Sequence, residues 1–185
     1  MQKKIKITNQ YLLSNKTILY PTDTVYGLGC DATNEKAVAK IYKIKKREES
    51  KSLIVLVNSM EMLQNYVTEI PQKIKDFLNQ TSKPTTVIYN NPKNLAKNVI
   101  AKDNTIAIRI VKKGFVNDLL NQLQKPIVST SANISNEPTP KDFKSISKKI
   151  KENVDFIVSL PSENKNSKPS QIIRLINDEI VFLRK

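Results

Sequence analysis

Short apolar runs rich in β-branched residues recur along the chain and alternate with segments whose apolar residues fall at helical spacing. The expected strands are residues 17–20, 53–57, 86–89, 105–111, 127–129, 156–158, 172–176 and 180–183. The expected helices are residues 35–46, 60–66, 72–79, 115–123 and 141–151. This alternation predicts an α/β fold in which helices flank a twisted mixed sheet. Because the chain has 185 residues, we expect one domain over residues 1–185.

Local signals support several of these bounds. Asn34 can cap the first expected helix through its side chain. Pro71 and Pro140 stand where the first turn of a helix tolerates proline. The polar stretch 162–169 predicts a loop that leads into a last two-stranded piece and could serve as a partial lid.

The residue types that are scarce exclude several kinds of chemistry. Histidine is absent, which excludes imidazole catalysis and histidine metal sites. Cys30 is the single cysteine, so no intramolecular disulfide or thiol zinc cluster can form, and we expect it to be a small packing residue. No stretch approaches the roughly 20 apolar residues that cross a bilayer, and residues 1–10 lack the apolar core of a signal peptide. We therefore expect a cytoplasmic protein that does not enter a membrane.

The chain is strongly basic, with 31 Lys and Arg against 17 Asp and Glu and a formal charge of +14. Such a charge attracts polyanions, either RNA or the phosphates of a nucleotide. The alternative is that lysines are spread over a solvated surface without a partner. Only cations inside a motif distinguish these interpretations.

The first such motif, YPTDTVYGLGCDA at residues 20–32, concentrates hydroxyls, two carboxylates and two glycines after an apolar strand. Gly27 and Gly29 permit either a positive φ or a close backbone approach. Three side chains offer donors and acceptors to an amino acid or a nucleotide: Thr22, Thr24 and Tyr26. The alternative is a turn whose hydroxyls satisfy one another.

The second motif, KIKKREESKSL at residues 43–53, brings Lys45, Arg47 and Lys51 together at the end of a helix and the following loop. Three cations at this spacing can hold a triphosphate, because Arg offers a bidentate fork and Lys a point charge. The alternative is a solvated basic helix terminus favoured by the helix dipole.

The third motif, PIVSTSANISNEP at residues 126–138, follows a buried-looking strand with small polar residues. Its candidates for phosphate and ribose contacts are Ser129, Thr130, Ser131 and Asn133. The alternative is an ordinary polar loop. Since Gly occurs only at positions 27, 29 and 114, neither a P-loop nor a dinucleotide fingerprint can form, so a nucleotide site must use side chains and strand ends.

Together the three motifs resemble the YrdC-like threonylcarbamoyl-AMP synthase family, whose members share YPTDTVYGLG, K-x-R with a following lysine, and STSAN in this order. The resemblance implies a YrdC-like fold with an open basic cavity. It also implies a nucleotidyltransferase that makes L-threonylcarbamoyladenylate and pyrophosphate from ATP, L-threonine and bicarbonate. ATP would be a substrate that carries Mg²⁺, and other proteins would transfer the group to tRNA as threonylcarbamoyladenosine.

Site residues follow from the resemblance by position. Lys45 and Arg47 form the K-x-R motif and are the implied catalytic pair. The implied threonine-binding residues are Thr22, Thr24, Tyr26 and Arg109. The implied ATP-binding residues are Lys45, Arg47, Lys51, Thr86, Ser129, Thr130, Ser131, Asn133, Ser170 and Arg184. Asp23 could orient the threonine amine or cap the turn that follows it.

Four positions depart from the family pattern: Lys83, Val111, Asn136 and Gln171. Asn136 replaces a glycine but can still adopt a left-handed conformation. One rival is a non-catalytic relative that binds RNA or ribosomal particles, which the +14 charge supports and the retained motif residues disfavour. A second rival, the carbamoyl-transfer module of a hydrogenase-maturation protein, needs zinc-finger domains that one cysteine cannot supply.

Overall fold

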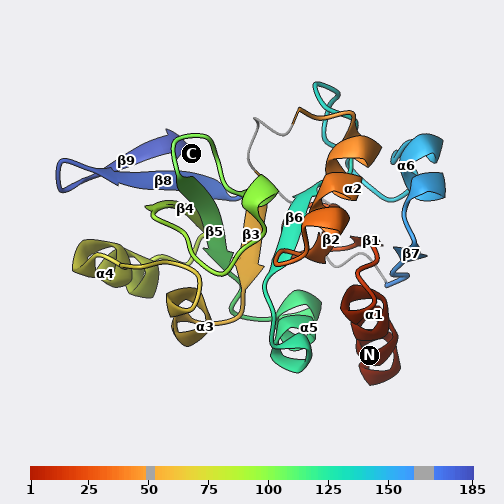
Figure 1. The fold of residues 1–185 in the computed structure, drawn as a ribbon, viewed down its shortest axis with the longest axis horizontal. Coiled ribbons are helices and arrows are strands. Elements are labelled where there is room, and N and C mark those ends of the chain that lie inside the picture. Colours follow the sequence, from red (N-terminus) through yellow and green to blue (C-terminus); the bar gives the residue numbers. More distant parts are fainter. Residues whose placement is uncertain (49–52, 161–168) are drawn as a thin grey trace.

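A computed structural model describes residues 1–48, 53–160 and 169–185. Nine strands form one mixed sheet in the order β7-β1-β2-β6-β3-β5-β4-β8-β9, which runs across Figure 1 from β9 to β7. The strands are β1 (Ile18–Tyr20), β2 (Gly27–Asp31), β3 (Ile54–Val57), β4 (Thr85–Asn90), β5 (Thr105–Ile110), β6 (Ile127–Ser131), β7 (Phe156–Ile157), β8 (Gln171–Ile176) and β9 (Glu179–Arg184). All eight expected strands are present within two residues at each end, and the α/β fold is confirmed.

Six α-helices and a short 3₁₀ helix accompany the sheet in the described ranges. They are α1 (Gln2–Leu13), α2 (Glu35–Lys45), α3 (Met60–Gln64), α4 (Gln72–Gln80), η1 (Lys97–Val99), α5 (Phe115–Leu123) and α6 (Lys148–Asn153). The Asn34 side chain caps α2 as predicted, because its Oδ1 accepts a 2.9 Å bond from the Ala37 amide. The predicted helix 141–151 is wrong at its start, since α6 begins only after Ser147, whose hydroxyl accepts from the Ile150 amide.

One face of the sheet is apolar from edge to edge. Alternate residues of neighbouring strands point to this face and are fully or almost fully buried, among them Leu28, Val55, Val128 and Ile108. The buried sides of α2, α3, α4 and α6 join the same hydrophobic cluster. This face therefore carries most of the hydrophobic core. The opposite face is not apolar throughout, and its side chains change in character from one part of the sheet to another.

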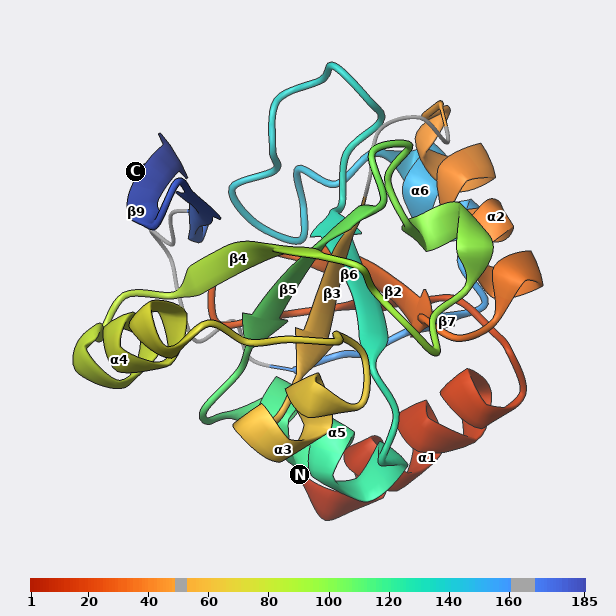
Figure 2. The same cartoon turned by 60° about the vertical axis from the view of Figure 1, so that its left-hand side comes forward.

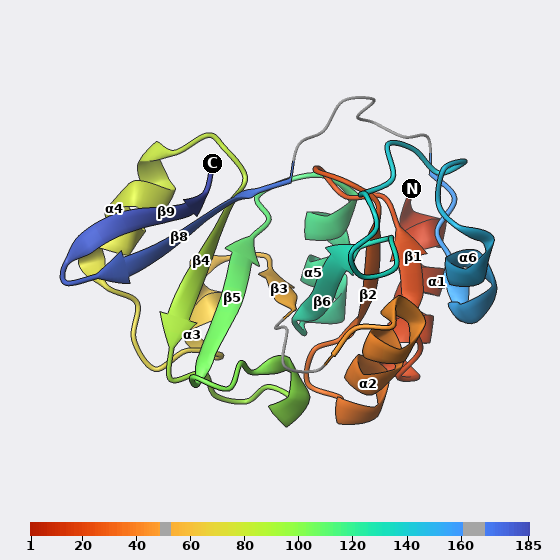
Figure 3. The same cartoon turned by 90° about the horizontal axis from the view of Figure 1, so that it is seen from above.

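The opposite face is divided into an apolar part and a polar part. Over the apolar part α1 and α5 lie side by side (Figure 2). Their side chains Ile5, Leu12 and Leu119 belong to a second hydrophobic cluster with residues of β1, β3 and β6. Over the polar part, the pairing of the strands brings together residues that are far apart in the sequence. The paired residues are Gly27 and Ser131, Gly29 and Ser129, Leu56 and Arg109, Arg109 and Thr86, and Ile172 and Arg184. Seen from above, the strands fan out with a marked twist (Figure 3).

The strand β2 was not among the expected strands, and its two glycines explain how it fits inside the sheet. Gly27 and Gly29 do not have a positive φ; Gly114 is the glycine that does in the described residues. A Cβ at Gly29 would lie 2.8 Å from both Tyr20 Cε1 and the Val128 carbonyl oxygen. The second expectation, a close backbone approach, is therefore the one that the structure confirms.

Cys30 packs in the core, as the sequence predicts. Its side chain is fully buried on β2, and this burial raises the pKa of the thiol well above its ordinary value. A raised pKa disfavours the reactive thiolate. Across the described ranges, the helices are too short or too polar to span a bilayer.

Candidate active site

A cavity of about 380 Å³ lies over the polar part of the divided face. Its floor is apolar and is formed by four residues of β3, β4 and β5: Ile54, Leu56, Ile88 and Ala107. Its walls come from the 21–26 loop, the end of β6, the segment after α2, and the β8–β9 hairpin. Segments from opposite ends of the sequence thus meet at one concave site, as small-molecule sites often do.

Among the described residues, the charged side chains that line this cavity are all cationic. Arg47, Arg109 and Arg184 line it, and the described lining residues include no Asp or Glu. Burial lowers the pKa of Arg184, which still leaves a guanidinium protonated near neutral pH. Such a site favours an anionic ligand, and a ligand with several negative groups most of all.

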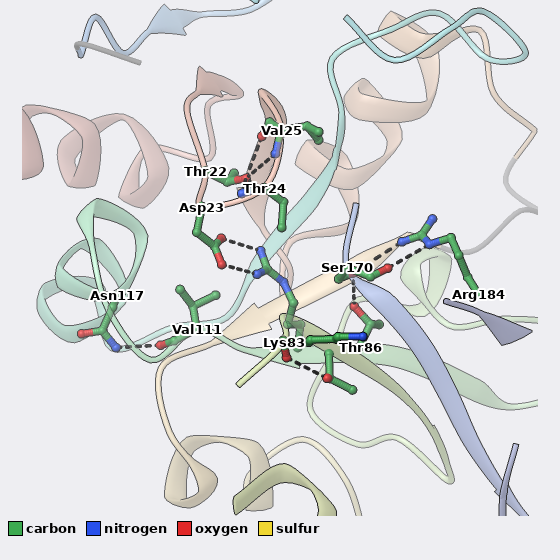
Figure 4. A network of polar contacts seen from close by, with 12 residues as sticks. Thr22, Asp23, Thr24, Val25, Lys83, Thr86, Val111, Asn117, Ser170 and Arg184 are labelled. Carbon is green, nitrogen blue, oxygen red and sulfur yellow. Dashed lines mark hydrogen bonds and ion pairs between the residues drawn. The ribbon is translucent and has the colours of Figure 1, made fainter. Parts of the chain in front are cut away.

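The 21–26 loop is held in shape by the hydroxyl of Thr22. This oxygen accepts from the amides of Thr24 and Val25 at 3.1 and 3.2 Å and donates to the Val25 carbonyl at 2.6 Å (Figure 4). The self-satisfied turn that was the alternative interpretation is therefore present at Thr22. Thr22 and Thr24 nevertheless both line the cavity.

Asp23 leaves this loop toward Arg109 and forms a two-pronged ion pair with it. Asp23 Oδ2 accepts from Arg109 Nη1 at 2.7 Å and Oδ1 accepts from Nη2 at 3.0 Å, as the dashed lines at Asp23 show in Figure 4. The Arg109 side chain is 5% exposed and that of Asp23 is 33% exposed. The sequence did not predict this pairing, because β5 and the loop are 86 residues apart.

Tyr26 lies away from the cavity lining. Its ring packs against Phe143 with the two ring centroids 5.8 Å apart, and burial raises the pKa of its hydroxyl. Its backbone carbonyl accepts a 3.0 Å bond from the Ala132 amide and so ties the 21–26 loop to the end of β6. Its predicted contact with threonine stays a prediction.

Lys45 is buried, although the sequence places it among three cations at a helix end that could hold a triphosphate. Only 1% of its surface is exposed, and its Nζ donates to the carbonyls of Ser131 and Asn133 at 2.5 and 2.7 Å. Burial, with a smaller contribution from the Arg47 charge, lowers the pKa of Lys45 to about 8. The Lys45 side chain thus holds the third motif in place from behind, while Arg47 lines the cavity.

The end of β6 lines the cavity with Ser129, Thr130 and Ser131, whose predicted contacts with phosphate and ribose stay predictions. Asn133 instead shapes the loop that follows, because its Nδ2 donates to the carbonyls of Ile134 and Glu137 at 2.9 and 2.8 Å. Asn136 has a φ of 69°, the left-handed conformation expected for a residue that replaces glycine.

The last predicted residues form a hydrogen-bonded chain at the far wall. Thr86 Oγ1 lies 2.8 Å from Ser170 Oγ, and Arg184 Nε donates to the Ser170 carbonyl at 2.9 Å (Figure 4). Ser170 and Arg184 line the cavity, and Thr86 is buried behind them. Lys51 and most of the 162–169 stretch lie outside the described residues.

Sequence reasoning missed part of the lining. Thr139 and Pro169 come from polar stretches without a distinctive pattern, and Ile54, Leu56 and Ala107 read as ordinary strand residues. A signal for these floor residues exists only once the register is known, since it places Ile54 beside Ser129 and Leu56 beside Arg109. In the described ranges, no group of three or more His, Cys, Asp or Glu residues could hold a metal ion.

Comparisons with known proteins agree on one family. The sequence profile of Sua5_yciO_yrdC, described as "Telomere recombination", matches residues 10–185. A protein of Pseudoalteromonas translucida named threonylcarbamoyl-AMP synthase is 33% identical over 172 residues, which cover 91% of each chain. The solved structure of P. abyssi Sua5 complexed with L-threonine is 26% identical with a TM-score of 0.90, and the alignment covers 100% of this chain and 54% of that one. The fold of E. coli YciO, 24% identical, matches with a TM-score of 0.86 over 100% of this chain and 90% of its own.

Proposed function

This chain belongs to the Sua5/YciO/YrdC family, and from that premise we propose that it is a threonylcarbamoyl-AMP synthase that works in the basic cavity over the divided sheet face. The observation that carries the proposal is the meeting of three sequence motifs at that cavity. Thr22 and Thr24 come from the first motif, Arg47 from the second and Ser129 to Ser131 from the third. Relatives that carry this name match nearly the whole chain.

The proposed reaction has two chemical steps. The amine of L-threonine first combines with bicarbonate to give a carbamate and water. A carbamate oxygen then attacks the α-phosphorus of ATP, the bond to the β-phosphate oxygen breaks, and pyrophosphate leaves with L-threonylcarbamoyladenylate as the second product. Neither step requires a histidine, which this chain lacks.

Electrostatic stabilisation is the main contribution we assign to the protein. Negative charge grows on the oxygens of the transferred phosphate and the leaving pyrophosphate, so cations fixed in advance lower the barrier by several kcal/mol, on the order of 3 per well-placed group. Arg47 and Arg184 lie at the cavity wall and can supply this charge. Lys45 contributes by holding the carbonyls of Ser131 and Asn133, which orients the hydroxyls of the third motif.

The cavity also offers groups for each substrate. The hydroxyls at the end of β6, with Ser170 supported by Thr86, suit phosphate and ribose oxygens. Thr24 and Arg109, on the side of the 21–26 loop, suit the amino acid, whose carboxylate matches a guanidinium fork. Mg²⁺ would enter with ATP as part of the substrate.

The product of the proposed reaction indicates the step that follows it. L-threonylcarbamoyladenylate is an activated acyl donor, so we propose that separate proteins transfer its group to tRNA to form threonylcarbamoyladenosine. The cytoplasm, where ATP and tRNA are both present, is the compartment we propose. Direct affinity for RNA from the basic surface remains a separate prediction.

Pyrophosphate release tests this function directly. The purified chain is incubated with ATP, L-threonine and bicarbonate, and each substrate is omitted in turn. We expect release that requires all three. Release that continues without threonine contradicts the proposal.

Variants then test the cavity. Arg47→Ala is expected to abolish pyrophosphate release because it removes a cation from the wall, and Lys45→Ala because it frees the Ser131–Asn133 backbone. Lys43 lies on the exposed side of α2, the helix that ends at Lys45, and Lys43→Ala is the matched control. Ordinary turnover in a folded Arg47→Ala variant would overturn the assigned phosphate side.

A further inference from the structure

Arg109 is a charged side chain placed at the centre of the sheet, with 4% of its surface exposed. A buried guanidinium costs stability unless a partner compensates its charge. Among the described residues, the carboxylate bonded to it is that of Asp23, at 2.7 and 3.0 Å. The Asp23 carboxylate therefore compensates the charge of Arg109 and so allows the guanidinium to be buried at this position.

The geometry of the pair leaves Arg109 able to bind a second carboxylate. Asp23 occupies the end of the guanidinium formed by Nη1 and Nη2. A guanidinium has five N–H donors, so two bonds leave three, which include Nε–H and the second hydrogen of the adjoining Nη. These two donors form another parallel fork of the kind that binds carboxylates. Arg109 lines the cavity, whereas Asp23 is not among its lining residues and lines a smaller pocket with Lys113 and Phe115.

Both members of the pair are held by rigid elements. Arg109 is paired in register with Leu56 on one side and Thr86 on the other, in the interior of the sheet. Asp23 follows Thr22, whose hydroxyl makes four bonds within the loop, one of them with the Thr24 hydroxyl at 3.0 Å. A charge pair anchored at both ends fixes the plane of the guanidinium before a ligand arrives, which reduces the ordering cost of binding.

We propose that Asp23 is a positioning residue for the carboxylate of the amino-acid substrate. It holds one end of the Arg109 guanidinium so that the adjoining edge faces the cavity, and it thereby selects ligands with a free α-carboxylate. This inference rests on the proposed function, since the ligand in question is L-threonine. It assigns Asp23 a role through Arg109 and no contact with the substrate.

The first test is Asp23→Asn, which keeps the size of the side chain and removes its charge. We expect the KM for L-threonine to rise about tenfold, because a charged hydrogen-bonding arrangement is lost, while kcat and the KM for ATP change less than about twofold. An unchanged KM overturns the proposal. A lowered KM also overturns it, since it would mean that Asp23 competes with the substrate for the guanidinium.

A double-mutant cycle separates positioning from direct contact. Arg109→Met removes the fork itself and is expected to raise the threonine KM more than Asp23→Asn does. If Asp23 acts through Arg109, the double variant has the KM of Arg109→Met alone. Effects that multiply would show that Asp23 contacts the substrate independently, and the proposal would fail.

Loss of stability is distinguished with a second ion pair whose carboxylate is buried. Asp31 is 1% exposed and accepts a 2.7 Å bond from Lys125 outside the cavity, so Asp31→Asn should lower the thermal midpoint without changing the threonine KM. Asp23→Glu keeps the charge and should restore most of the threonine affinity. L-threonine binding measured by calorimetry gives the same comparison without turnover, so a wild type that binds threonine but releases no pyrophosphate contradicts the proposed function alone.

Discussion

Lys45 is a charged side chain enclosed by the protein, and its protonation state is coupled to the shape of the site. Its Nζ donates to two backbone carbonyls of the third motif. Burial and the nearby Arg47 lower its pKa from 10.5 to about 8. The unfolded chain would therefore keep this proton to a higher pH than the folded chain does. Charged Lys45 costs stability at neutral pH, and this cost is relieved as the pH rises from about 8 toward 10.5.

Activity should change in the opposite direction to stability over this range. Deprotonation removes the charge that holds the carbonyls of Ser131 and Asn133, so we expect kcat/KM for pyrophosphate release to fall as the pH rises through about 8. Lys45→Arg keeps its charge to much higher pH and should show no such fall, even if its activity at pH 7 is lower. The measurement is a pH–rate profile of both proteins. Equal declines in the two would mean that another group titrates.

At the scale of elements, most strands were predictable because runs of β-branched residues indicate buried strands directly. Two elements, α1 and β2, were not predicted from the sequence. On α1, residues 5, 8, 9 and 12 are buried at helical spacing, but Thr8 and Asn9 are polar, so the hydrophobic period is broken. On β2, Gly27 and Gly29 lower strand propensity, yet the strand is fully buried between β1 and β6. In both elements the conformation depends on tertiary packing and not on the local sequence pattern.

The candidate site shows the same limit. Its polar residues were found through motifs, and most of those described line the cavity. The partner of Arg109 was not found, because a contact between residues 86 positions apart depends on the order of the strands. Asp23 was expected to orient an amine or cap a turn, and its paired position follows only from the folded sheet.

At the β7 edge of the sheet, one carboxylate adds side-chain bonds to the backbone pairing of β7 with β1. Asp155 accepts from the amide and hydroxyl of Thr17, each at 2.8 Å, and from Lys40 Nζ on α2 at 2.7 Å. Burial alone would raise the pKa of Asp155, but these bonds outweigh it and lower the pKa from 3.8 to about 2. Three elements therefore depend on its charge: β1, β7 and α2.

Asp155→Asn should lower the free energy of unfolding by about 1 kcal/mol near neutral pH, after allowance for solvent screening. Because the folded pKa is depressed, the stabilisation is full above about pH 4 and is lost as the pH falls toward about 2. The difference between wild type and variant in urea unfolding should thus be smaller at pH 3 than at pH 6. Asp178→Asn removes an exposed partner of Lys73 and should change stability little at either pH.

At the scale of the whole molecule, one sheet serves two purposes because its faces differ. The apolar face holds the larger core cluster, and the other face is covered by α1 and α5 over only part of its width. Neighbouring residues of one strand therefore have unrelated roles. On β5, Ala107 lies on the cavity floor, while Ile108 is 2% exposed in the core. Substitutions at these two positions should separate function from stability.

Ala107→Leu adds volume to a solvent-accessible cavity of about 380 Å³, so no packed neighbour has to move. We expect pyrophosphate release to be lost while the thermal midpoint stays within about 3 °C, since surface-like substitutions change stability little. Ile108→Ala should do the reverse and lower the free energy of unfolding by about 2–5 kcal/mol, because it leaves a void in the core. Its activity per folded molecule should be retained at low temperature. A fully active Ala107→Leu variant would mean that the substrates bind elsewhere, since a leucine on this floor occupies the space that they need.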